Sequence, residues 1–227
     1  MLKAEEFRLF FSLLLRPRGK ASFLNSVPKN ARILDVGCGN NSPFRVKSQR
    51  PDVFYVGLDV DNYNQKVNPN CYADQYIIVS SKDFVEEIGK FYDSFDTVIS
   101  SHNLEHCERQ DELLAAMLKA LKKGGRIYIS FPCEESIHFP RRRDTLNFYD
   151  DSTHLRVLNF NETINKIKSY GFVIDFAVKR YRPFILFLAG SILEPLALIL
   201  KRNMPFGSTW AFYGFETIIW ASRREKV

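Results

Sequence analysis

The stretch ILDVGCGNNSP constrains the fold of this chain more than any other. An apolar run ends in Asp35, and Gly37 and Gly39 follow, which is the pattern of a buried strand that turns sharply beside a bound molecule. A dinucleotide-binding turn would have a third glycine where this chain has Ser42, and a phosphate-binding P-loop would need a Gly-Lys-Ser/Thr that is absent. Ser42 and Pro43 instead predict the N-cap and the first residue of a helix.

A second acidic residue follows this turn at a spacing that suits the binding of a ribose. Asp35 would repel a pyrophosphate, but it suits a cofactor that carries positive charge. The next apolar run, DVFYVGLDV, reaches Asp59 about 20 residues after the turn, where a carboxylate can accept hydrogen bonds from both hydroxyls of a ribose. Strand, acid, paired glycines and second acid together predict a cofactor that contains a ribose and a cationic group.

Strand-like and helix-like runs alternate along the chain from about residue 21. Seven short apolar runs predict strands, at residues 31–37, 52–60, 75–81, 94–101, 125–132, 172–178 and 216–222. DELLAAMLKALKKGG predicts a helix that Gly124 ends, and NETINKIKSYGF predicts a helix with Asn161 as N-cap and Gly171 at its end. We therefore expect an α/β fold whose mostly parallel sheet is covered on both faces, with ligands bound beyond the carboxyl ends of the strands.

Length and composition favour a single domain over residues 1–227. Residues 1–20 are expected to form a helical extension, and residues 183–210 an apolar insertion. The four cysteines lie far apart in the sequence and form no CxxC pair, so we predict neither a disulfide framework nor a metal site, and a cytoplasmic protein. The net charge of +6 favours anionic ligands without choosing among them.

These motifs resemble those of the class I S-adenosylmethionine-dependent methyltransferases. ILDVGCGNNSP is similar to the first motif of that family, FDTVISSHNLEH to its fourth-strand motif and LKKGGRIYISFP to its fifth strand. The resemblance implies a Rossmann-like seven-stranded sheet whose last strand runs antiparallel between the fifth and the sixth. It implies S-adenosylmethionine as the cofactor, and as its binding residues Asp35, Gly37, Cys38, Gly39, Asp59, Asp83, Phe84, Ser101 and Asn103.

The adenine site departs from the usual pattern of the family, which has a Gly-Asp after the third strand. In VSSKDFVEEIG, Asp83 is the match for the adenine amine and Phe84 for the ring. Asp74 is an alternative to Asp83, and Asp83 could equally be an ordinary acid at the start of a helix.

Four histidines follow the fourth and fifth strands, at the predicted active edge. We predict His154 as the catalytic base that takes the proton of the methyl acceptor, with His102 as second choice, because the usual pKa of histidine suits proton transfer near neutrality. His106 is expected to brace the following helix. Arg141, Arg142 and Arg143 suggest either a clamp for a phosphate-bearing acceptor or a solvated loop.

The insertion contains PFILFLAGSILEPLALIL, which is interrupted by Glu194 and Pro195 and flanked by basic residues. We expect a helical hairpin or a bent helix on a membrane surface or over the acceptor pocket. The alternatives are burial on the domain itself or in a homodimer interface.

We interpret the chain as an enzyme that methylates an oxygen of a sugar or glycan intermediate in surface polysaccharide biosynthesis. The glycan assignment depends on the likeness of DSTHLRVLNFNETINKIKSYGF to the acceptor side of bacterial glycan- and lipid-modifying methyltransferases. The alternatives are another small or lipid acceptor, an NAD(P)-dependent oxidoreductase, and a non-catalytic membrane or nucleic-acid adaptor. We expect a cytoplasmic protein at the inner face of the membrane, with no nucleic acid as partner.

Overall fold

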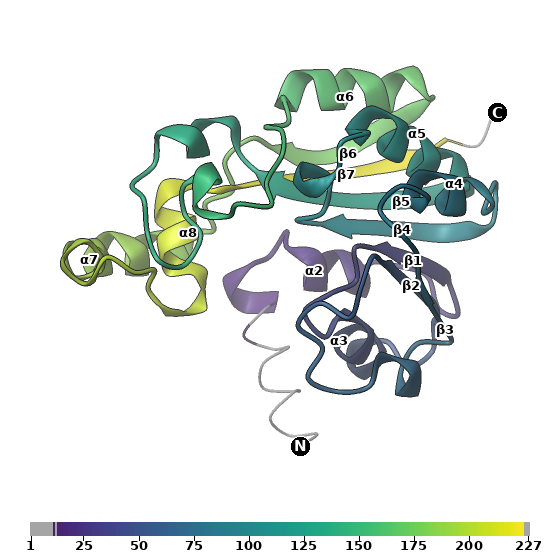
Figure 1. Cartoon of the computed structure of the whole chain (residues 1–227), viewed down its shortest axis with the longest axis horizontal. Helices are drawn as coiled ribbons and strands as arrows, with labels where there is room; N and C mark the ends of the chain where they lie inside the picture. The colour runs from purple at the N-terminus through teal and green to yellow at the C-terminus, as the bar shows by residue number, and fades with distance from the viewer. Residues whose placement is uncertain (1–10, 12, 225–227) are drawn as a thin grey trace.

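The computed structural model describes residue 11 and residues 13–224. Its centre is one seven-stranded sheet in the order β3-β2-β1-β4-β5-β7-β6 (Figure 1). The strands are β1 (Arg32–Val36), β2 (Phe54–Asp59), β3 (Gln75–Ile78), β4 (Phe95–Ser101), β5 (Leu121–Pro132), β6 (Phe172–Val178) and β7 (Glu216–Arg223). The predicted fold class is confirmed, including β7, which pairs antiparallel with both β5 and β6.

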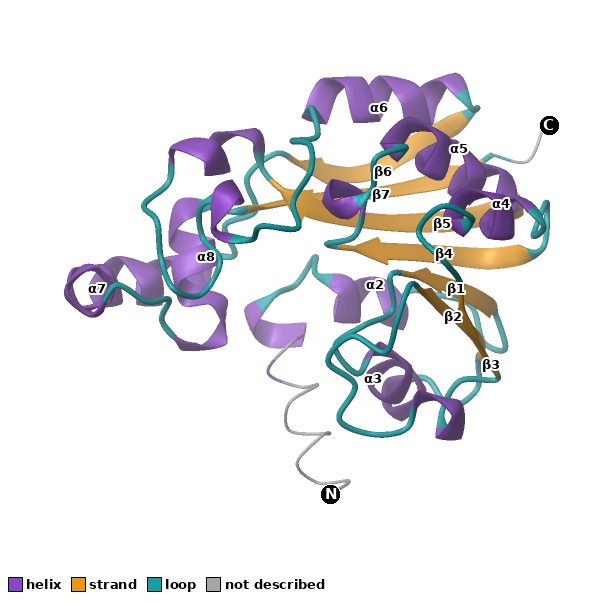
Figure 2. Ribbon diagram, in the orientation of Figure 1, coloured by secondary structure: helices purple, strands orange, loops and turns teal. Residues whose placement is uncertain are grey.

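Helices cover both faces of the sheet (Figure 2). Their buried side chains pack against the strands in two hydrophobic clusters. On one face lie α4 (Phe84–Gly89), α5 (Gln110–Ala120) and α6 (Phe160–Ser169), and on the other lie α2 (Lys20–Asn25) and α3 (Ser42–Gln49). Short 3-10 helices occupy the loops: η1 (Pro69–Cys71), η2 (Leu104–His106), η3 (Glu134–His138), η4 (Phe148–Asp150) and η5 (Pro205–Gly207). Burial on both faces explains why the strands read as nearly continuous apolar runs.

The structure corrects three predicted helix boundaries. The helix expected to stop at Gly124 ends four residues earlier, and Gly124 lies inside β5 with a φ of +76°. The N-cap of α6 is Asn159, whose side chain accepts from the Glu162 backbone N–H, and not Asn161. Ser42 is the first residue of α3 rather than its N-cap, because Asn41 takes the N-cap position with a φ of +58°.

The apolar insertion forms a helical hairpin, as expected, from α7 (Phe184–Leu200) and α8 (Ser208–Tyr213). Gly190 allows the close approach, because a Cβ there would overlap the Ser208 carbonyl and the Phe212 side chain. No helix in the described part of the chain is long and apolar enough to cross a membrane. Most of the helical extension predicted for residues 1–20 lies outside the described residues.

Candidate active site

The carboxyl ends of the parallel strands form one edge of the sheet, on the side where α7 and α8 lie (Figure 2). β1 is flanked by β2 and β4, so the strand order reverses there. In open α/β sheets, ligands bind in the crevice outside the strand ends at such a reversal. Most of the sequence-predicted site residues end or follow strands at this edge or lie on the loops beyond it. Asp35 lies inside β1, and the alternative Asp74 precedes β3.

The glycine turn after β1 is pressed against neighbouring side chains. Gly37 has a φ of +75°, and a Cβ there would overlap the side chain of Asn103. A Cβ at Gly39 would come within 3.0 Å of the Tyr63 ring. Cys38 is fully buried, so only its backbone can contact a ligand. Both glycines are therefore needed for close approach, and their neighbours in this structure are Asn103 and Tyr63.

Asp35 is buried, and its charge is compensated within the protein. Its Oδ2 accepts from Lys20 Nζ at 2.9 Å, from Ser42 Oγ at 2.5 Å and from the Tyr55 hydroxyl at 2.8 Å. Its Oδ1 has no hydrogen-bond partner among the residues described. Because Lys20 already neutralises this carboxylate, it attracts a cationic cofactor less than the sequence suggests.

Asp59 ends β2 in a different environment. Its side chain is buried, and burial raises its pKa to about 6, although its own Oδ1 accepts the Val60 backbone N–H at 2.8 Å. Within the described part of the chain no cation pairs with it. A desolvated carboxylate without a cation is well suited to bind ligand hydroxyls, as predicted for the ribose.

Ser101 ends β4 and Asn103 follows it, opposite the glycine turn. Ser101 Oγ lies 3.0 Å from Ser130 Oγ. Asn103 Nδ2 is buried and has no partner among the described residues. The unpaired Asn103 amide and the backbone of the Gly37 turn suit the carboxylate of S-adenosylmethionine. The Asp59 carboxylate, which has no cationic partner among the described residues, suits its ribose hydroxyls.

The candidate residues for the adenine site differ in burial and in position relative to the strands. Asp83 is exposed, accepts from Ser80 Oγ at 2.7 Å and stands at the N-terminus of α4. Phe84 is buried in the hydrophobic core. Asp74 precedes β3, at the amino end of that strand, and pairs with Lys47 at 3.0 Å. This alternative therefore lies away from the carboxyl ends of the strands, and Asp83 stays our candidate.

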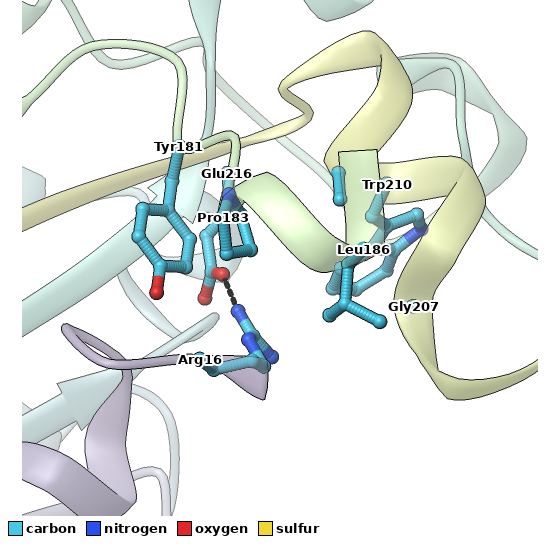
Figure 3. A pocket seen from close by; sticks show the side chains of 8 residues that line it. Arg16, Tyr181, Pro183, Leu186, Gly207, Trp210 and Glu216 are labelled. Atoms are coloured by element: carbon cyan, nitrogen blue, oxygen red, sulfur yellow. Dashed lines mark hydrogen bonds and ion pairs between the residues drawn. The ribbon is translucent and has the colours of Figure 1, made fainter. Parts of the chain in front are cut away.

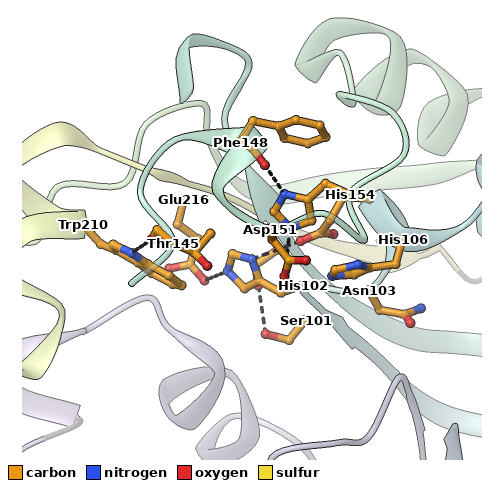
Figure 4. A network of polar contacts seen from close by, with 12 residues as sticks. Ser101, His102, Asn103, His106, Thr145, Phe148, Asp151, His154, Trp210 and Glu216 are labelled. Carbon is orange, nitrogen blue, oxygen red and sulfur yellow. Dashed lines mark hydrogen bonds and ion pairs between the residues drawn. The ribbon is translucent and has the colours of Figure 1, made fainter. Parts of the chain in front are cut away.

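His102 sits between two buried carboxylates (Figure 4). Its Nδ1 lies 3.2 Å from Glu105 Oε1 and its Nε2 lies 3.2 Å from Glu216 Oε1. Burial alone would lower the pKa of His102, but these carboxylates outweigh it and raise that pKa to about 9. His102 is therefore protonated near neutrality, which argues against its role as a base.

His154 is buried but keeps one ring nitrogen free of strong partners. Its Nδ1 lies 2.6 Å from the Phe148 carbonyl, while its Nε2 is 3.9 Å from Asp151 Oδ2. Burial lowers its pKa, so the ring is neutral at pH 7. Its ring centroid is 4.8 Å from that of His106, which contacts the loop before His154 rather than a helix. His154 remains our candidate for activating the acceptor.

The arginine run does not act as a three-residue clamp. Arg142 is buried and pairs with Glu194 of α7, which also accepts from the Tyr213 hydroxyl at 2.6 Å. Arg141 and Arg143 are exposed. The acid that interrupts the apolar insertion thus fastens α7 to the loop after β5.

A pocket opens between the segment before α2 and the hairpin (Figure 3). Leu186 and Trp210 line one side, and an ion pair between Arg16 and Glu216 lies on the other. Burial alone would raise the pKa of Glu216, but Arg16 and His102 lower it to about 2. The sequence analysis missed both members of this pair and Glu105, although a glutamate that begins an apolar strand or follows an apolar run is a usable signal.

Comparison with known proteins identifies the domain type. Residues 34–129 match the family model described as a methyltransferase domain. The chain is 30% identical over 115 residues to an uncharacterised protein of Methanocaldococcus jannaschii, covering 48% of this chain and 31% of that protein. It is 26% identical over 110 residues to a tRNA (carboxymethyluridine(34)-5-O)-methyltransferase of Arabidopsis thaliana, covering 48% of this chain and 26% of the other. The chain thus spans about a third or less of the length of these relatives.

A solved structure extends the likeness over nearly the whole fold. An S-adenosylmethionine-dependent methyltransferase from Mesorhizobium loti aligns with a TM-score of 0.58 and 19% identity, covering 90% of this chain and 97% of that one. The two proteins share a fold.

Proposed function

We propose that this chain, which belongs to the class I S-adenosylmethionine-dependent methyltransferases, transfers a methyl group to an oxygen of a sugar or glycan intermediate. The observation that carries the proposal is the pairing of the Gly37 turn with the uncompensated Asp59 carboxylate at adjacent strand ends. A second enzyme class, the NAD(P)-dependent oxidoreductases, would need the third glycine that Ser42 replaces.

The cofactor, when bound, supplies a methyl group on a positively charged sulfur that an oxygen can attack directly. Asp59 would accept hydrogen bonds from the ribose hydroxyls, and the backbone of residues 37–39 would lie along the cofactor. Asn103 Nδ2 would donate to its carboxylate, and Asp83 would accept from its adenine amine. Phe84 would support the ring from the core, and Ser101 would line the crevice.

The acceptor would approach from the loops above β4 and β5. As the acceptor oxygen forms its bond to the methyl carbon, the electron pair of the sulfur–carbon bond stays on sulfur and the hydroxyl proton is lost. His154 would promote that loss, because its ring is neutral and its Nε2 is available. The exposed Arg141 and Arg143 would favour an acceptor that carries phosphate, such as a sugar nucleotide or a lipid-linked sugar.

The exposed face of α7 supports contact with a membrane surface. Phe184, Ile192 and Ile199 lie along one side of the helix at 73%, 78% and 78% exposure, and Phe206 in η5 is 84% exposed. The opposite side of α7 is buried. Basic residues flank the helix, which suits a leaflet rich in anionic lipids. We propose that α7 seats the protein on the inner membrane face, where a lipid-linked acceptor would be found.

Binding of S-adenosylhomocysteine by calorimetry tests the cofactor assignment directly. Micromolar binding with one molecule per chain is expected, and no binding would end the proposal. A screen of sugar nucleotides and lipid-linked glycans by mass spectrometry would then identify the acceptor from the gain of one methyl group.

Co-sedimentation with anionic phospholipid vesicles tests the surface of α7. The protein should pellet with these vesicles, and the variant Ile192→Glu/Phe206→Glu should stay in the supernatant. Equal pelleting of both proteins would contradict the membrane proposal. A dimer that this variant dissociates would point to the homodimer interface instead.

A further inference from the structure

We propose that Glu105, His106 and His154 form a binding site for a divalent transition-metal ion at the acceptor end of the active site. The three residues come from two segments, η2 and the loop after η4. One ligand atom from each lies within 4.8 Å of those of the other two. The Leu155 backbone N–H donates to the Glu105 carbonyl at 2.9 Å, which holds the two segments together.

Both imidazoles are oriented as metal ligands usually are. His154 Nδ1 lies 2.6 Å from the Phe148 carbonyl (Figure 4). His106 Nδ1 lies 3.2 Å from the Thr153 carbonyl. A carbonyl only accepts, and the Thr153 hydroxyl, 2.9 Å from His106 Nδ1, donates its proton to Asp151 Oδ1. Each Nδ1 therefore carries the proton and donates it. The lone pair of each ring is then on Nε2. A hydrogen bond from the other ring nitrogen to a carbonyl is the common second interaction of a metal-binding histidine.

Glu105 supplies an independent observation. Its side chain is fully buried, and its Oε1 is 3.2 Å from His102 Nδ1. Its Oε2 is also buried and has no hydrogen-bond partner among the described residues. A buried carboxylate oxygen without a partner is costly, and a cation beside it would remove that cost.

The composition of the cluster favours a particular class of ion. Two imidazoles and one carboxylate suit Zn²⁺ and similar transition metals better than Mg²⁺, which prefers oxygen ligands. Bonds of about 2.1 Å place tetrahedral ligand atoms roughly 3.4 Å apart, so the separations between ligand atoms would shrink by up to about 1.4 Å on binding. Asp151 is not one of the three ligands, and its Oδ2 lies 3.9 Å from His154 Nε2.

Three protein ligands leave a coordination position for an oxygen of the acceptor. This part of the inference rests on the proposed function. A hydroxyl bound there would have a lower pKa and would release its proton to solvent water. His154 would then activate the acceptor through the ion instead of by taking the proton itself.

Titration with Zn²⁺ after removal of bound metal by a chelator tests the site, using the full chain without a histidine tag. Calorimetry should show one ion per chain, and Co²⁺ in its place should give the visible absorption of a tetrahedral site. His106→Gln and His154→Ala should each weaken Zn²⁺ binding at least tenfold, and His138→Ala, at an exposed histidine outside the cluster, should leave it unchanged. His106 is only partly buried, so its variant is expected to fold.

Absence of Zn²⁺ binding, or binding that neither His106→Gln nor His154→Ala weakens, would overturn the inference. Binding of S-adenosylhomocysteine is measured on the same samples. If the metal binds and S-adenosylhomocysteine does not, the proposed function fails and the metal site stands. If S-adenosylhomocysteine binds and the metal does not, the reverse holds.

Discussion

The two halves of the proposed site, which we call the cofactor half and the acceptor half, are built in different ways. In the cofactor half, Gly37 follows β1 and Asp59 ends the neighbouring β2, so the backbone alone places them together. In the acceptor half, ion pairs join segments that are far apart in the chain, such as Arg16 with Glu216 and Arg142 with Glu194. Local strand order fixes one half, and long-range charge pairing fixes the other.

The two halves also differ in whether a buried carboxylate is paired with a cation. Asp59 has no cationic partner among the described residues, and its pKa rises to about 6. Glu216 is at least as buried, but Arg16 and His102 lower its pKa to about 2. A carboxylate left uncompensated is available to a ligand, whereas one already compensated holds the protein together.

The largest effect should come from breaking a charge pair of the acceptor half. Arg142→Met leaves Glu194 charged and buried, which should lower the free energy of unfolding by about 3–5 kcal/mol. Urea denaturation measures this change. Arg143→Met, at the exposed neighbouring position, should cost less than about 0.5 kcal/mol. The double variant Arg142→Met/Glu194→Leu should recover most of the loss. If the single variant is as stable as the wild type, the pair does not fasten α7.

Asp59→Asn should have a smaller effect than Arg142→Met, and it should raise the stability of the ligand-free protein instead of lowering it. It removes an ionised acceptor of two hydrogen bonds, so the affinity for S-adenosylhomocysteine in calorimetry should fall about 100-fold. It also removes an uncompensated buried charge, so the midpoint of thermal unfolding without ligand should rise by a few degrees. Asp35→Asn should lower that midpoint, because the Asp35 carboxylate is paired with Lys20. A lower unfolding midpoint in both variants would contradict the proposal that Asp59 is uncompensated and Asp35 is compensated.

The smallest effect is a dependence of cofactor affinity on pH. The pKa of Asp59 in the folded protein, about 6, lies above its usual value, so lowering the pH through 6 protonates it and stabilises the ligand-free fold. The same protonation removes the acceptor for the ribose hydroxyls. Affinity for S-adenosylhomocysteine should therefore fall about tenfold between pH 7.5 and pH 5. The Asp59→Asn variant should show a flat profile over this range, and an equally steep one would assign the dependence to another group.

The sequence predicted the sheet that carries the proposed cofactor half because its signals are local. Strand ends, a glycine turn and an acid at fixed spacing lie within one short segment, and the strand pattern was sufficient to predict the sheet. Helix ends were predicted less well, since Asn159 and Asn161 are chemically identical N-cap candidates and only the packed helix selects one. Gly124 has the positive φ expected of a helix stop but uses it inside β5.

The acceptor half could not be predicted in the same way. Arg142 looks like its two neighbours in the sequence, and only its contact with Glu194, 52 residues away, separates a structural role from a ligand-binding one. Arg16 and Glu216 are 200 residues apart. Such pairs carry no spacing signal, so their roles emerge only when the chain is folded.

The position of β7 has a consequence for how the protein is made. β6 pairs with β7 alone, and β7 is the last of the seven strands to leave the ribosome. Until β7 has been synthesised, one edge of β5 is unpaired and β6 has no neighbouring strand. Arg16 and His102 also lack their contact with Glu216, the first residue of β7. Nascent chains should therefore depend on protection from aggregation until that strand inserts, and the charge balance around His102 should be completed in the same event.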